Sequence, residues 1–181
     1  MSDTKEKTVQ TMLETKCEFS TLEAVKMVGK LGTKQFFTAP ASTKYHGAYV
    51  SGLYCHSVEV MHNLVLLTEK LNLQWENPRS PYIVGLFHDL CKCDQYMWSI
   101  DDDKYIYNPN MLLDGHGEKS IIVTQSLGID LTEEEMACIR WHMGAFDDKE
   151  NWKHYTNAIK KYPNVLWTHT ADMMASHIYG I

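Results

Sequence analysis

Histidine and aspartate side chains occur in this sequence inside segments that are otherwise apolar. They are His56, His88, Asp89, His116, His142 and Asp172. A buried aspartate is rare unless it is paired or binds a metal, and imidazole together with carboxylate suits Zn, Fe, Mn, Co or Ni rather than Ca. One histidine in such a place is usually an ordinary core residue, whereas six such side chains together predict a metal site.

The adjacent residues His88 and Asp89 set a condition on the backbone. Neighbouring residues of a regular helix point in different directions, so both can reach one metal only where the helix is irregular or ends. A short apolar helix is predicted over 81–91, and its end before Lys92 provides such a place.

Apolar residues at helical spacing and capping residues predict about six or seven helices, so that the chain is mainly α. The helical ranges are 20–30, 49–71, 81–91, 117–127, 132–143, 151–160 and 165–177, and a small β-hairpin is predicted from 96–98 and 105–107. Two of the helices open with capping boxes, Ser20 with Glu23 and Thr132 with Glu135. The six candidate ligands are spread over five of these helices.

Length and composition predict one compact domain. The 181 residues are enough for a sizeable core, and we expect residues 1–44 to form a helical extension that packs on a core made by residues 45–181. The net charge of -6 argues against a basic surface for duplex nucleic acid. A local cationic site or a bound metal would still admit a small anionic substrate.

Three further features concern the cellular location. No apolar run approaches the roughly 20 residues of a membrane-spanning helix, and the polar N-terminus has no signal-peptide core. The five cysteines are odd in number and scattered, which does not fit a disulfide framework, so Cys91 and Cys93 are expected to be reduced, buried thiols. We therefore expect a cytoplasmic protein without a membrane partner, and a homodimer is compatible with the sequence.

The order of the candidate ligands resembles the HD superfamily of metal-dependent phosphohydrolases. Residues 52–60 read GLYCHSVEV, similar to the family's segment G-L-x-x-H-S/T-x-x-V, and include His56. Residues 85–92 read GLFHDLCK, similar to the family's L-x-H-D-I-G-K, with Lys92 in register. Leu90 and Cys91 stand where that motif has Ile and Gly, which changes the turn and leaves the ligands in place.

Other segments resemble bacterial HD proteins similar to 3′–5′ exoribonucleases. Residues 114–117 read DGHG, around His116, and residues 139–144 read IRWHMG, similar to I-x-x-H-H-G with Met143 at the second histidine. Residues 169–172 read HTAD, similar to H-x-A-D, and end at Asp172. The resemblance covers the chain from about residue 45 to residue 179 and implies a single helical HD domain.

The resemblance also implies roles for the candidate ligands. A first metal would be held by His56, His88, Asp89 and Asp172, and in relatives with two metals the aspartate of the HD pair bridges them. By that pattern Asp89 would be the bridge, and His116 and His142 would complete the second site. The alternative is a single metal, with His116 and His142 binding a substrate phosphate or moving protons. The cofactor would be one or two divalent ions of Mn, Fe, Co, Ni, Zn or Mg.

Three basic residues near the motif have weaker assignments. Lys92 could neutralise a phosphate oxygen, and a solvated lysine at a helix end is an equal alternative. Arg140 could contact an anionic substrate, although a surface arginine is the plainer interpretation. His169 lies on one helix face with Asp172 and could orient a ligand through a hydrogen bond, or it could simply be packed.

The predicted function is hydrolysis of a phosphoester, in a nucleotide, a short or cyclic oligonucleotide, or another small phosphorylated metabolite. A bound divalent cation lowers the pKa of its water to roughly 7 and draws charge from the transition state, which is the chemistry this reaction needs. Two alternatives remain: a di-iron oxygenase that cleaves a C–C or C–P bond, and a regulatory module that binds a nucleotide without turnover. The remaining histidines match no motif and are expected to be surface or core residues: His46, His62, His154 and His177.

Overall fold

The computed structural model describes residues 2–181 and is mainly α-helical, with one small antiparallel β-hairpin, as the sequence predicts. The α-helices among these residues are α1 (Ser2–Lys16), α2 (Thr21–Thr33), α3 (Gly52–Leu71), α4 (Ser80–Phe87), α5 (Gly117–Ser126), α6 (Glu133–Trp141), α7 (Trp152–Lys161) and α8 (Asn164–Met173). The hairpin pairs β1 (Tyr96–Ser99) with β2 (Lys104–Tyr107). Short 3₁₀ segments cover Leu90–Cys93, Gly144–Phe146 and Lys149–Asn151.

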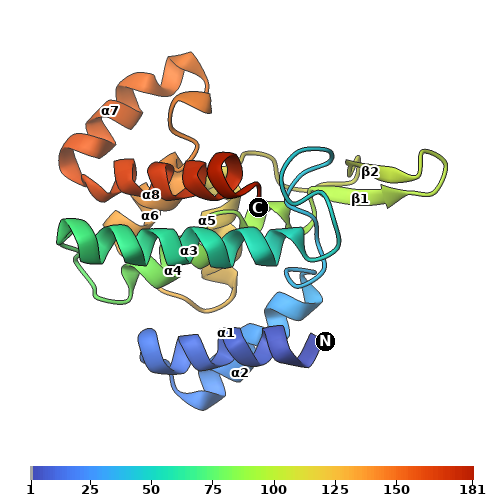
Figure 1. Cartoon of the computed structure of the whole chain (residues 1–181), viewed down its shortest axis with the longest axis horizontal. Helices are drawn as coiled ribbons and strands as arrows, with labels where there is room; N and C mark the ends of the chain where they lie inside the picture. Colours follow the sequence, from blue (N-terminus) through green and yellow to red (C-terminus); the bar gives the residue numbers. More distant parts are fainter. Residues whose placement is uncertain (1) are drawn as a thin grey trace.

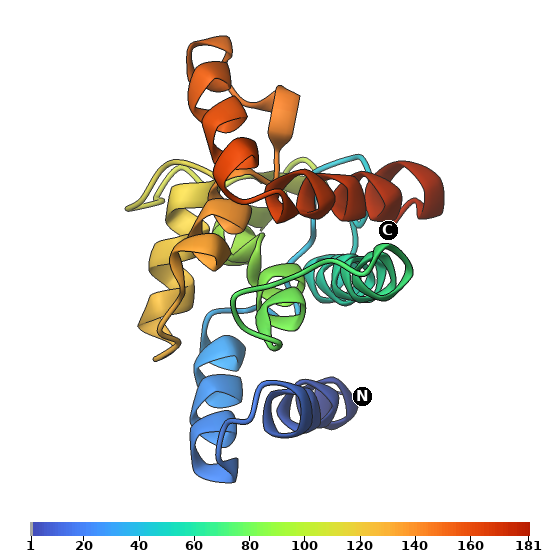
Figure 2. The ribbon, with the colours of Figure 1, turned by 90° about the vertical axis from the view of Figure 1, so that its left-hand side faces the viewer.

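Helix α1 is one more helix than the six or seven that the sequence predicts. Most of its side chains are polar, so the apolar spacing that marks the other helices is weak here. A narrow apolar stripe on α1 holds the helix in place, because its Val9 and Leu13 are buried in the same core as the apolar face of α2. Figure 1 shows the α1–α2 pair beneath α3 and α4, and the turned view of Figure 2 places α7 on the opposite side.

Helix α3 packs against both α4 and α8. The approach to α4 is close because Gly85 has no side chain: a Cβ there would come within 2.4 Å of the Cα of Met61. A second close approach brings α5 against α6, where a Cβ on Gly117 would meet the carbonyl oxygen of Arg140 at 2.3 Å. Glycine at these two positions lets helices that carry candidate ligands lie side by side.

Two helices end differently from the prediction, and both ends lie near the candidate ligands. Helix α4 ends at Phe87 rather than near residue 91, because Asp89 leaves the helical region with φ -112° and ψ 20° before the 3₁₀ turn begins. Helix α8 passes into a π-helix, Met174–Tyr179, and Gly180 then adopts a left-handed conformation with φ +71°. The chain turns back at this glycine and brings residue 181 over α3.

The segment between α2 and α3 is irregular and crosses toward the candidate ligands. Its backbone is tied to the bundle by hydrogen bonds such as that from the N–H of Leu53 to the carbonyl of Ala39, at 3.0 Å. The cysteines form no disulfide within the described chain. None of the helices between residues 2 and 181 combines the length and apolar character that crossing a membrane requires.

Candidate metal centre

The structure brings the six candidate ligands together in the interior, from five helices. His56 lies in the first turns of α3, and Asp172 lies near the end of α8. His88 and Asp89 follow directly after α4, where the helix ends as the adjacent pair requires. His116 stands at the N-cap position of α5 and His142 at the C-cap position of α6.

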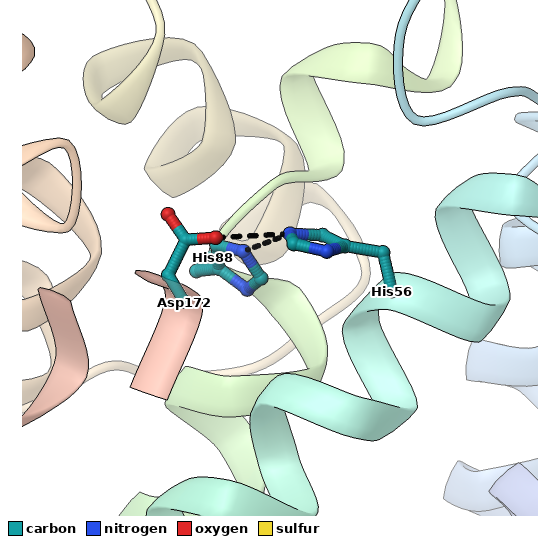
Figure 3. A group of neighbouring side chains, drawn as sticks. All are labelled: His56, His88 and Asp172. Atoms are coloured by element: carbon teal, nitrogen blue, oxygen red, sulfur yellow. Dashed lines mark hydrogen bonds and ion pairs between the residues drawn. The ribbon is translucent and has the colours of Figure 1, made fainter. Parts of the chain in front are cut away.

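Three of these side chains converge around the Nε2 atom of His56 (Figure 3). This atom lies 3.1 Å from Asp172 Oδ1 and 3.3 Å from His88 Nε2. One carboxylate oxygen of Asp89, Oδ2, faces the same group, at 3.4 Å from His56 Nε2 and 3.5 Å from His88 Nε2. Two imidazoles and two carboxylates thus present their donor atoms to one small volume.

The other carboxylate oxygen of Asp89 faces a different pair of histidines. Its Oδ1 atom lies 2.8 Å from His116 Nε2 and 3.4 Å from His142 Nε2. The Asp89 carboxylate therefore stands between two groups of imidazoles, with one oxygen toward each.

Backbone carbonyl groups hold three of the rings by their Nδ1 atoms. The acceptors are the oxygens of Ile181 for His56 at 2.9 Å, Gly85 for His88 at 2.8 Å, and Ile139 for His142 at 2.7 Å. Because a carbonyl oxygen can only accept, each Nδ1 carries a proton. The Nε2 atom of each ring then faces the cluster and can bind a metal once it carries no proton, which is the arrangement found for metal-binding histidines.

Mutual stabilisation of opposite charges shapes the pKa values in this cluster. Burial alone would raise the pKa of Asp89, but the charge of Lys92 and the neighbouring His88 hold it well below its usual range. Burial opposes a charge on His56, yet its hydrogen bonds to Asp172 and Asp89 raise its pKa to about 9. Burial would likewise raise the pKa of Asp172, but the hydrogen bond to His56 outweighs burial and lowers that pKa. Both carboxylates are therefore ionised near neutral pH, and a cation bound here would replace the proton on His56.

The donor atoms fit a metal ion. His142 Nε2 is fully buried and has no hydrogen-bond partner anywhere in residues 2–181, which is costly for a polar atom unless something binds it. Three overlapping sets of donors lie close enough to share an ion: His56, His88 and Asp172; His88, Asp89 and His142; and Asp89, Cys91 and His116. The described residues could therefore hold a metal ion, with nitrogen and oxygen donors that suit a transition metal.

A cavity of about 330 Å³ opens above the cluster. Lys92, His116, His169 and Asp172 line it together with side chains from the irregular segment, the hairpin and the C-terminal π-helix. The lining residues from these three segments include Ser42, Tyr45, His46, Tyr96, Tyr107, Ser176 and His177.

The three basic residues that the sequence singled out lie in different surroundings. Lys92 is buried and its Nζ lies 2.6 Å from Asp89 Oδ2. Arg140 lines a neighbouring hollow beside His116, but its guanidinium is already engaged by Glu118 and Asp147, each at 2.5 Å.

His169 contacts the main chain beside the cluster. Its Nδ1 lies 2.7 Å from the backbone carbonyl of His142, so it donates a hydrogen bond to the main chain of a candidate ligand. A Cβ added to Gly144 would come within 2.7 Å of two atoms of the His169 ring, so the turn at Gly144 packs closely against that ring.

Sequence reasoning did not select several residues that lie at the site. His46 and His177 were expected to be surface or core residues, yet both line the cavity, and the ring of His46 lies 5.0 Å from that of His56. Cys91 was expected to be an ordinary buried thiol and lies beside His116. No local signal marks His46, because it lies in an irregular segment that carries no helical spacing. Cys91 had a signal, its place two residues after Asp89.

Comparisons with protein-family models, curated proteins and solved structures found no match to this chain.

Proposed function

We propose that this protein is a metal-dependent phosphohydrolase, as the resemblance to the HD superfamily implies. One observation supports the proposal most strongly: the buried Asp89 carboxylate directs its two oxygens to separate histidine groups beneath an open cavity. This arrangement suits a carboxylate that bridges two ions. His56, His88, Asp89 and Asp172 would hold the first ion, and Asp89, His116 and His142 the second.

A divalent ion bound here would activate water as a nucleophile near neutral pH and would polarise a phosphoryl oxygen. The protein's own residues would do the rest. Lys92 keeps Asp89 ionised and lines the cavity, where its ammonium group would contact a phosphate oxygen of the substrate. The carbonyl groups behind His56, His88 and His142 keep the rings oriented while the substrate binds and leaves.

The size and lining of the cavity support a small substrate. Its volume of about 330 Å³ lies at the lower end of the range typical of small-ligand pockets. The rings of Tyr96 and Tyr107 form part of its wall and lie 5.2 Å apart, which offers an aromatic surface to a nucleobase. We therefore favour a nucleotide, a cyclic dinucleotide or a very short oligonucleotide, and not duplex nucleic acid.

The test is elemental analysis of the purified protein together with a panel of phosphoesters. The panel contains nucleoside mono-, di- and triphosphates, cyclic nucleotides and short oligonucleotides, assayed without oxygen in the presence of Mn, Co, Ni or Mg. We expect release of phosphate or nucleotide from at least one member. Oxygen consumption by an iron-loaded protein that hydrolyses nothing would instead support an oxygenase. Tight nucleotide binding with no turnover would support a regulatory module.

A substitution of Asp89 tests the central residue of the proposal. We expect Asp89→Ala to abolish both metal binding and hydrolysis, because both proposed sets of metal ligands lose an oxygen donor. Asp101→Ala, in the exposed turn of the hairpin, is the matched control and should leave both unchanged. An unaltered metal content in purified Asp89→Ala would contradict the assignment.

A further inference from the structure

Cys91 places a thiol beside His116, which together with His142 faces Asp89 Oδ1. Its side chain is fully buried, and its Sγ atom lies 3.3 Å from His116 Nδ1 and 4.0 Å from both His116 Nε2 and Asp89 Oδ1. The HD motif that the chain resembles has glycine at this position, so the thiol is a feature of this sequence.

The spacing of the three donors is close to that of a tetrahedral metal site. With bond lengths of about 2.3 Å to sulfur and about 2.0 Å to nitrogen or oxygen, tetrahedral donors lie about 3.3–3.6 Å apart. In the structure, His116 Nε2 and Asp89 Oδ1 are 2.8 Å apart, and Cys91 Sγ is 4.0 Å from each. Shifts of about half an ångström, within the reach of side-chain rotation, would bring all three to one ion.

A fourth donor lies beside the same oxygen of Asp89. The Nε2 atom of His142 is buried without a hydrogen-bond partner among the described residues and lies 3.4 Å from the same Asp89 Oδ1. With this nitrogen added to the set of Asp89, Cys91 and His116, the donors beside Asp89 Oδ1 would be one oxygen, two imidazole nitrogens and one sulfur, a combination that four-coordinate zinc accepts.

We propose that the Cys91 thiolate is a ligand of the second metal ion, together with Asp89, His116 and His142. This inference rests on the proposed function for the identity of the other three ligands. On binding, the S–H bond breaks, its electron pair stays on sulfur and forms the metal–sulfur bond, and the proton passes to solvent. A thiolate makes the second position selective for thiophilic ions such as Zn²⁺, Co²⁺ or Cd²⁺ over Mg²⁺.

Cobalt substitution tests this ligand directly. The protein is titrated with two equivalents of Co²⁺, and the near-ultraviolet charge-transfer absorption of a cobalt–thiolate bond is measured. We expect the absorption in the natural sequence and in Cys93→Ser, a buried neighbour in the same 3₁₀ turn, and its loss in Cys91→Ser. Zn²⁺ affinity at the second position should fall in Cys91→Ser by more than the roughly 10–100-fold that loss of an outer hydrogen-bond partner costs.

A measurement on the unaltered protein keeps the test independent of how the variants fold. X-ray absorption at the zinc edge, with two equivalents bound, should show a sulfur shell at about 2.3 Å. Absence of this shell, or absorption that persists in Cys91→Ser, would overturn the proposal and leave Cys91 as a hydrogen-bond partner of His116. Phosphoester turnover is assayed on the same samples. Turnover without a sulfur ligand refutes only this inference, and a sulfur ligand without turnover refutes only the proposed function.

Discussion

His116 differs from the other candidate ligands in its surroundings. It is the most exposed of the four imidazoles, at 27% of its side chain, and its Nδ1 atom contacts the sulfur of Cys91 rather than a backbone carbonyl of the described residues. It begins α5, so its position depends on where that helix starts rather than on a buried helix face. The second ion should therefore be the more weakly held of the two.

We expect His116→Ala to lower the metal content from two ions per chain to one. The first group keeps His56, His88, Asp89 and Asp172, whereas the second loses a nitrogen donor. Elemental analysis after dialysis measures the count, with His154→Ala, on the outer helix α7, as the control. A count of one in both proteins would favour the one-ion alternative, and a count that stays at two would show that the two-ion arrangement with His116 as a ligand is wrong.

At the level of single residues, the sequence was most informative where a polar residue interrupts an apolar helix. His56, His88 and Asp172 could be found in this way because each breaks an apolar pattern, and the structure brings all three together. Cys91 was marked only by its place two residues after Asp89, and it was not selected because a thiol suits a buried helix equally well. The carbonyl of Ile181 could not be found at all, since every residue has one.

At the level of elements, the contact between α5 and α6 fixes the distance between His116 and His142. The two rings lie 5.0 Å apart, and the helices approach closely only because residue 117 is glycine. We expect Gly117→Ala to force α5 from α6, with a loss of about 1–3 kcal/mol in the free energy of unfolding and weaker binding of the second ion. Chemical denaturation and metal titration measure the two effects.

Gly29→Ala provides the control for that substitution. Residue 29 lies within α2, on an exposed position where a Cβ would meet nothing within 4 Å. This change should stabilise the protein by about 0.5–1 kcal/mol, because alanine loses less backbone entropy than glycine in a helix. If Gly117→Ala were equally harmless, the close contact between α5 and α6 would not be what positions His116 and His142.

The ends of elements show what sequence patterns can and cannot predict. Both predicted capping boxes are present, Ser20 with Glu23 and Thr132 with Glu135, because they depend on residues only three positions apart. The early end of α4 and the π-helix after α8 were not predicted. Both depend on contacts with helices distant in the sequence, which local propensity does not encode.

At the level of the whole molecule, the buried charges couple metal binding to folding. An ion that binds only the folded state at 100 times its dissociation constant stabilises that state by about 2.7 kcal/mol. We expect added Zn²⁺ or Mn²⁺ to raise the melting temperature and a chelator to reverse the rise, as measured by thermal denaturation. Asp172→Asn should abolish most of the shift. No shift with any of the divalent ions named above would argue against a metal centre in this fold.

The hydrogen bond from His56 to the carbonyl of Ile181 joins residues that are 125 positions apart. During translation, the N-terminal helices and α3 emerge well before the partner that steadies this imidazole has been made. A chain that is stalled or cut short could form much of its helical structure and still hold His56 loosely. Full assembly of the centre would thus wait until residue 181 has been made and has folded back to His56.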